Sequence, residues 1–99
     1  MSTKAPDIRG TITAIRDGGD GGTISILVEA PVGASTTFDK AWVSLARDTR
    51  LLETSGEDFV AVSPSALMIG EFVEATFDGP VMESYPVQAR AREIVIVKS

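Results

Sequence analysis

The stretch from Gly79 to Ile96 constrains the fold more than any other part of this 99-residue chain. A loop held by two prolines leads there into a long segment in which small apolar and long polar residues alternate, as in a β-strand with one buried face. The apolar positions change parity within that segment, from Val87, Ala89 and Ala91 to Ile94 and Ile96. One strand buries both sets only if it is bulged or sharply bent, and we expect that irregularity near Arg92-Glu93.

The first strand-like segment, from Ile8 to Arg16, has a similar irregular spacing. Ile12 and Ile15 are three residues apart, so a regular period of two does not bury both, and we predict a bulge between them. Gly10 weakens the interior of this strand and favours a bulge or a bend. The glycine-rich stretch 17–22 that follows is typical of a hairpin loop, because glycines adopt positive φ angles without strain.

Five strands are expected in all, from their β-branched residues and their alternation. They are residues 8–16, 23–30, 38–46 with an extension at 50–52 after a break, 71–77 and 87–97. The residues expected to face a common core are Val28, Val43, Val73 and Ala89. The short apolar segment 59–62 is not assigned to any element.

A single short helix is predicted for residues 63–70, with Ser63 as its N-cap, Pro64 at its first position and Gly70 after its last turn. Three strands, a short helix and two further strands is the order of the OB-fold, a five-stranded partly open barrel. An SH3-like barrel is the alternative, but its helical element falls just before the final strand. We therefore predict an all-β, OB-fold-like barrel in which residues 7–99 form one domain behind a flexible lead at 1–6.

The composition excludes several classes of chemistry. The chain has neither cysteine nor histidine, so it has no disulfides, no thiol catalysis, no Ser-His-Asp triad and no histidine metal ligand. Asp17 and Asp20 share a flexible loop but lack the spaced oxygens of a calcium site, so we expect no metal and no cofactor. Catalysis would have to use carboxylates such as Asp39, Glu53, Glu71, Glu74 or Glu83, with Lys40 or a serine. Their spacing does not indicate a catalytic pair, and we expect no enzymatic activity.

The net charge of −5 bears on the partners of the protein. Proteins that bind nucleic acid without regard to sequence neutralise phosphates with an excess of lysine and arginine, so a nucleic-acid partner is not expected here. The first residues contain no apolar targeting segment, and no run is long enough to cross a membrane. The expected location is therefore the cytoplasm, with no membrane partner.

Several motifs resemble those of small bacterial OB-fold families of unknown function. One set is Gly10, Ile12 and Ile15 before a glycine-rich hairpin, and another is Leu67, Gly70 and Val73. The ending Gly79-Pro80-Val81-x-Glu83-Ser84-Tyr85-Pro86-Val87-Gln88-Ala89-x-Ala91-x-x-Ile94 is similar to one such family of short barrel proteins found in Firmicutes and related bacteria. The resemblance implies the barrel fold and transfers no catalytic residue. Some members of that family are exported or lipid-anchored, but this sequence shows no signal peptide and no lipobox cysteine.

Trp42, Arg90 and Arg92 form the main candidate site. Trp42 alternates away from its apolar neighbours, and so do the two arginines, so all three are expected on the outside of the barrel. The third and fifth barrel strands of an OB-fold are neighbours, so an outward tryptophan there would lie beside outward arginines and stack with them. In the alternative interpretation, Trp42 covers one end of the barrel and the arginines belong to a solvated face.

Tyr85 lies on the loop between the last two strands, one of the two loops that frame ligands in OB-folds. The alternative is a structural plug over the barrel opening, with Pro86 fixing the start of the strand. Together these residues predict a non-catalytic binding module for a protein segment or a small ligand. The alternatives are a single-stranded nucleic-acid binder and a structural barrel that self-associates weakly through a strand edge.

Overall fold

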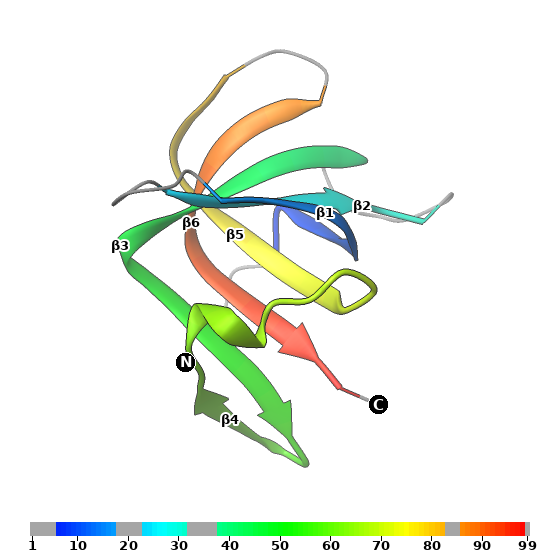
Figure 1. Cartoon of the computed structure of the whole chain (residues 1–99), viewed down its shortest axis with the longest axis vertical. Helices are drawn as coiled ribbons and strands as arrows, with labels where there is room; N and C mark the ends of the chain where they lie inside the picture. Colours follow the sequence, from blue (N-terminus) through cyan, green and yellow to red (C-terminus); the bar gives the residue numbers. More distant parts are fainter. Residues whose placement is uncertain (1–5, 18–22, 32–37, 83–85, 99) are drawn as a thin grey trace.

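The chain forms six strands and one short 3₁₀ turn (Figure 1). The computed structural model describes residues 6–17, 23–31, 38–82 and 86–98. The elements are β1 (Ile8–Asp17), β2 (Ile24–Glu29), β3 (Lys40–Ser55), β4 (Asp58–Ala61), the 3₁₀ turn η1 (Pro64–Ala66), β5 (Phe72–Met82) and β6 (Val87–Val97). Strands dominate the described residues, so the predicted all-β class is confirmed.

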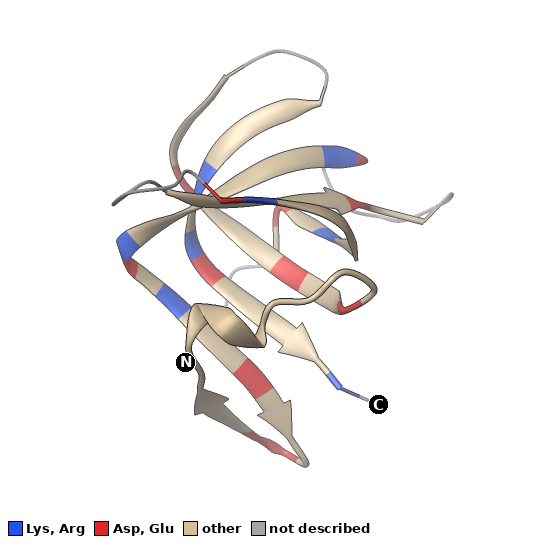
Figure 2. Ribbon diagram, in the orientation of Figure 1, with Lys and Arg blue, Asp and Glu red and all other residues tan. Residues whose placement is uncertain are grey.

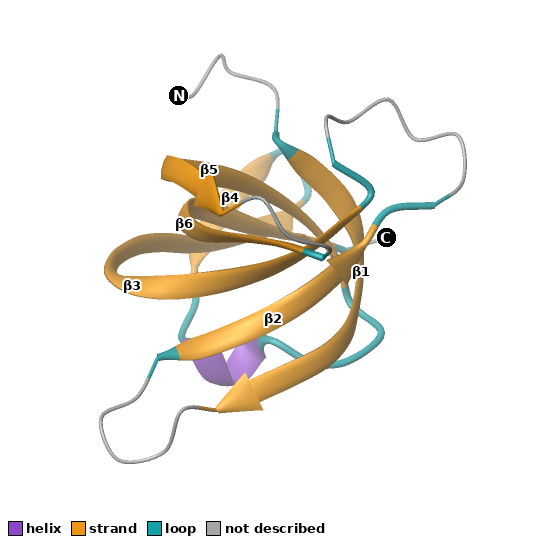
Figure 3. Cartoon of the chain, turned by 90° about the horizontal axis from the view of Figure 1, so that it is seen from above, coloured by secondary structure: helices purple, strands orange, loops and turns teal. Residues whose placement is uncertain are grey.

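Five of the strands close into a barrel, which Figure 3 shows from above. β1 pairs antiparallel with β2 and β5, β2 with β3, and β5 with β6. A parallel pairing between β3 and β6 completes the ring. The turn η1 precedes β5 rather than the final strand, as the OB order requires and the SH3-like alternative does not. The predicted OB-like barrel is therefore confirmed.

Two bulges bend the strands where the changes of parity predict them. In β1 the register with β2 shifts between Ile12 and Ala14. In β6, Phe77 of β5 pairs with Ala91 and Thr76 pairs with Glu93, so Arg92 is the extra residue. The bulge in β6 buries apolar residues on both sides of it. The bulge in β1 buries Ile12 fully but leaves Ile15 38% exposed, which corrects the expectation that it would bury both.

β3 is longer than predicted and does not break at residues 47–49. It runs on through a wide bulge in which four residues of β3 lie opposite one residue of β6. Thr49 fixes this bulge, because its hydroxyl accepts a hydrogen bond from the Ala46 N–H at 2.7 Å and donates one to the Ala91 carbonyl at 2.7 Å. In Figure 1, β3 turns a corner at this point and then runs down to its hairpin with β4.

β4 lies outside the barrel and pairs only with β3 among the described strands. It forms from the apolar segment that the sequence pattern left unassigned, and all four of its residues are exposed. Its second edge is the one at which pairing with another copy would occur, and that self-association stays a prediction.

The predicted helix is shorter than expected. Only Pro64–Ala66 is helical, and the Ser63 hydroxyl makes no capping hydrogen bond to the backbone. The chain leaves the helical conformation at Leu67, whose side chain is 6% exposed and belongs to the core. Gly70 has a φ of +98°, as a left-handed cap would, but its N–H donates to the Ile12 carbonyl at 2.8 Å. Contact with the barrel thus replaces the remaining turns of the helix.

The inward faces of all five barrel strands supply one apolar core. Val28, Val43 and Val73 are fully buried and Ala89 is 6% exposed, so the predicted core positions are confirmed. No buried residue in the described part of the chain is polar or charged. The outward residues are therefore the ones available for binding.

The hydrogen bonds of Thr49 give a first expected result. Thr49→Val keeps the shape of the side chain but leaves the Ala46 N–H and the Ala91 carbonyl without their partner. We expect a loss of about 2 kcal/mol in the free energy of unfolding, measured by urea titration. Thr54→Val on the same strand is the matched control, because its hydroxyl accepts a single exposed hydrogen bond from the Lys98 N–H at 2.8 Å. Equal losses in the two variants would contradict the role given to Thr49.

Candidate functional site

The outer surface of the barrel carries two parallel rows of side chains that cross all five barrel strands. The strand registers align the first, here called the arginine row, as Arg16, Ser25, Ser44, Arg90 and Asp78. The second, here called the tryptophan row, is Ala14, Leu27, Trp42, Gln88 and Met82. A polar row with two arginines, two serines and one aspartate thus runs beside a mostly apolar one.

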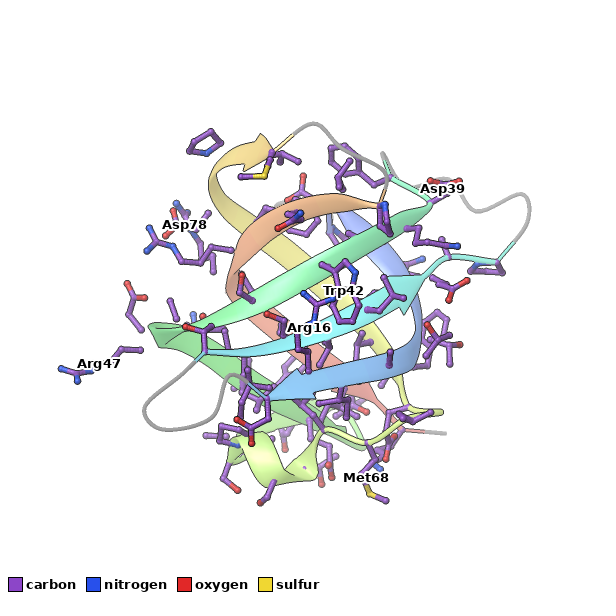
Figure 4. The ribbon with its side chains drawn as sticks, turned by 45° about the horizontal axis from the view of Figure 1, so that its top comes forward. Arg16, Asp39, Trp42, Arg47, Met68 and Asp78 are labelled. Atoms are coloured by element: carbon purple, nitrogen blue, oxygen red, sulfur yellow. The ribbon has the colours of Figure 1, made fainter. Side chains whose placement is uncertain are left out.

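Trp42 is covered by an arginine from a strand two positions away. The guanidinium carbon of Arg16 lies 4.1 Å from the centre of the indole ring, and Figure 4 shows the two side chains together on the outside of the barrel. A cation–π contact of this kind is worth about 0.5–2 kcal/mol, and it favours this position of the Arg16 side chain over others. Trp42 itself is half-buried and lies on the outer face, as its alternation predicts.

Arg90 and Arg92 also lie outside the barrel, but they do not stack on Trp42. Both contact one carboxylate, that of Asp78, with N–O distances of 4.0 and 3.4 Å. Their side chains are 61% and 68% exposed. The structure thus corrects the predicted stacking: register places Arg90 opposite Ser44 rather than opposite Trp42.

Arg16 is the residue that the sequence analysis missed. Counted in steps of two from the buried Ile12, Arg16 would face the core. The bulge between Ile12 and Ala14 reverses the parity and turns Arg16 outward, opposite Ser25. The predicted bulge could have revealed this, because a bulge reverses which residues face outward after it, and Arg16 comes after it in the strand.

Most cations of the described chain are already paired with carboxylates. The pairs are Arg9–Glu74 at 2.9 Å, Lys40–Glu29 and Arg50–Glu93 at 3.6 Å, Lys98–Glu71 at 2.7 Å, and the two arginines on Asp78. Among the described lysines and arginines, Arg16 and Arg47 alone have no carboxylate within 4.0 Å. In Figure 2, blue and red segments are scattered over the strands and do not separate into two regions of opposite charge. In a chain of net charge −5, these two are the described cations that are free for an external anion.

Of the other candidate carboxylates, Glu53 and Glu71 both lie near the single cation Lys98. Glu71 and Glu74 are engaged in ion pairs, and the hydrogen bond with Glu71 raises the pKa of Lys98 above its ordinary value. Asp20, Glu83 and Tyr85 lie outside the described residues. Within the described ranges, no three carboxylates come together in a way that would hold a metal ion.

Comparison with protein-family models, with curated proteins and with solved structures found no match to this chain. The resemblance to a bacterial OB-fold family therefore stays a prediction. The helical part of the described structure is the three-residue turn η1, so no helix there has the length and apolarity needed to cross a membrane.

Proposed function

We propose that this protein is a non-catalytic binding module whose arginine row holds an extended, acidic segment of another protein. The observation that carries the proposal is Arg16, a cation without a carboxylate partner that is held in place by Trp42 on the outer face of the barrel. OB-folds bind their ligands on this face, over the second and third barrel strands.

The stacking of Arg16 on Trp42 supports binding through its effect on the guanidinium group. Stacking uses the flat face of the group and leaves its N–H donors at the edge for a carboxylate. A side chain that already favours one position loses less conformational entropy when a ligand binds. Arg90, in the same row, shares Asp78 with Arg92, and among the described residues it has no other acidic partner, so N–H donors of Arg90 are open to a ligand.

The spacing along the row supports an extended ligand. Adjacent strands lie about 4.8 Å apart, so Arg16 and Arg90, separated by three such steps, are about 14 Å apart along the barrel surface. In an extended peptide, side chains at positions i and i+4 point to the same side and lie about 13 Å apart. Two acidic residues at this spacing match the two arginines, and Ser25 and Ser44 lie between them.

The test is a titration with the peptide Gly-Glu-Ser-Ser-Ser-Glu-Gly, followed by NMR shifts of the protein. We expect binding that weakens at least tenfold in Arg16→Gln and in Arg90→Gln, because each variant removes a charged hydrogen bond worth about 1.5–3 kcal/mol. Arg9→Gln is the matched control on β1, since Arg9 is paired with Glu74 away from the row. A peptide with Gln in place of both Glu residues should not bind.

Two results would contradict the proposal. One is the absence of binding at millimolar peptide, and the other is an equal loss in Arg9→Gln and Arg16→Gln. Oligo-dT serves as a further arm, and we expect its dissociation constant to be about 10⁻⁴ M or weaker at physiological salt. Micromolar, salt-sensitive binding of oligo-dT would replace the proposal with a nucleic-acid function.

A further inference from the structure

A second candidate site lies at the corner of β3, away from the arginine row. An open cleft of about 800 Å³ is bounded by the start of β2, the second half of β3 and the segment from β4 to η1. Its walls are mostly apolar and include Ile24, Leu45, Leu51, Ala61 and Val62. The volume falls within the range of small-molecule sites, about 300–1,000 Å³.

Two barrel strands, β2 and β3, form part of this cleft, and the segment from β4 to η1, outside the five-stranded ring, forms the rest. One wall is the wide bulge of β3, which Thr49 ties to the Ala91 carbonyl on β6. The opposite wall is the end of β4 with Val62 and Pro64, and the Val62 N–H donates to the Leu51 carbonyl at 3.0 Å. All residues of β4 are exposed, so the β3–β4 hairpin adds little to the core. Its last residue, Ala61, instead lines the cleft.

Two of the residues that line the cleft are arginines, and none is acidic. Arg47 lines it and has no carboxylate partner, and Figure 4 shows its side chain extending away from the body of the molecule. Arg50 also lines it, is 66% exposed and has its one carboxylate contact, with Glu93, at 3.6 Å. Asp48 lies between them in sequence, and Figure 2 shows the corner of β3 as blue, red and blue.

We propose that this cleft binds the carboxylate of a free fatty acid, with the hydrocarbon chain along the apolar walls and the carboxylate at Arg47 and Arg50. A mostly apolar hollow with two arginines in its lining is complementary to a molecule that is apolar along its length and anionic at one end. The site shares no residue with the arginine row, so the two proposals succeed or fail separately.

The experiment is a calorimetric titration with octanoate, decanoate and dodecanoate below their micelle-forming concentrations, with decan-1-ol as the uncharged probe. Each further buried CH₂ is expected to tighten binding about fourfold until the cleft is filled. Decanoate is expected to bind about tenfold more tightly than decan-1-ol, because its carboxylate forms charged hydrogen bonds with the arginines and the hydroxyl of the alcohol forms weaker, uncharged ones.

Three variants locate the site. Arg47→Gln combined with Arg50→Gln should reduce the affinity for decanoate to that for decan-1-ol and leave decan-1-ol unchanged. Ala61→Trp, at an exposed position on the cleft wall, should abolish binding of both while the melting temperature stays within a few degrees. Arg90→Gln, in the arginine row, is the matched control and should change neither affinity.

The proposal is overturned if dodecanoate does not bind, or if decanoate and decan-1-ol bind equally to the parent protein. It is also overturned if Arg90→Gln weakens decanoate as much as the double variant does, since binding would then be a general attraction to positive charge. Unchanged binding to a folded Ala61→Trp variant would place the ligand elsewhere.

Discussion

The Val73→Asp variant is expected not to fold. Val73 is fully buried in β5, where Gly10 of β1 and Ile96 of β6 lie opposite it in the registers. The described core contains no buried polar or charged group, so a carboxylate placed there would have no partner. A domain of this size has about 5–15 kcal/mol of stability in total, and burying an unpaired charge removes most or all of it. Circular dichroism of the purified variant should show no cooperative melting.

Val60→Asp is the matched control, because it makes the same substitution on a strand outside the barrel. Val60 is 45% exposed on β4 and lies opposite Glu53 of β3. The new carboxylate stays in water, and repulsion from Glu53 costs no more than about 1 kcal/mol. This variant is expected to fold and to melt within a few degrees of the parent. A soluble Val73→Asp protein with a cooperative melt would show that β5 does not face the core as described.

Gly10→Ala is the second substitution with a large expected effect. A Cβ at this position would overlap the backbone carbonyl of Glu29 and would lie 2.7 Å from the backbone nitrogen of Ala30. Backbone atoms of a paired strand do not move aside as the end of a flexible side chain does, so β1 and β2 would have to separate. We expect a loss above the about 1–3 kcal/mol that is typical of overpacking, measured by urea titration.

Gly56→Ala separates this steric effect from the general cost of replacing glycine. Gly56 lies in the β3–β4 turn with a φ of +62°, and no atom lies within 4 Å of the added Cβ. Its substitution should therefore cost only the strain of the left-handed conformation, about 1–2 kcal/mol. If Gly10→Ala were no more destabilising than Gly56→Ala, the close approach of β1 to Glu29 would be wrong.

The barrel could be predicted from the sequence because each bulge in a strand changes the spacing of the apolar residues around it. A bulge reverses the parity of the apolar residues, and the reversal in β6 placed its bulge at Arg92 correctly. The inward residues of the regular strands follow from alternation alone. The bulges and the inward positions depend on residues that are close in sequence, so the spacing of apolar residues is enough to predict them.

Two predictions from the sequence, the break in β3 and the length of the helix, were wrong. Both depend on contacts between residues that are far apart in the sequence. The sequence predicts a break in the strand at residues 47–49, yet β3 continues through them because the Thr49 hydroxyl donates a hydrogen bond to the carbonyl of Ala91, 42 positions further along the chain. The helix predicted at 63–70 has good end signals, but the core takes up Leu67 and ends it after three residues. Local propensity was overridden by tertiary packing in both places.

The sequence predicted only those features of the candidate site that depend on alternation within one strand. The outward direction of Trp42, Arg90 and Arg92 follows from alternation. Which arginine reaches the indole ring depends on how four strands align, and that register is not visible in any single segment. Arg16, 26 positions before Trp42 in sequence, became its neighbour only when the barrel closed.

The parallel pairing of β6 with β3 has a consequence for how the protein is made. Translation produces the other five strands first, and until β6 emerges the strands on either side of its place, β3 and β5, each lack a neighbour. Closure therefore waits for residues 87–97 and joins positions as far apart as Ala41 and Val87. A ribosome that stalls before Val97 carries a nascent chain in which β3 and β5 each have an unpaired edge, and unpaired edges are prone to pair with other chains.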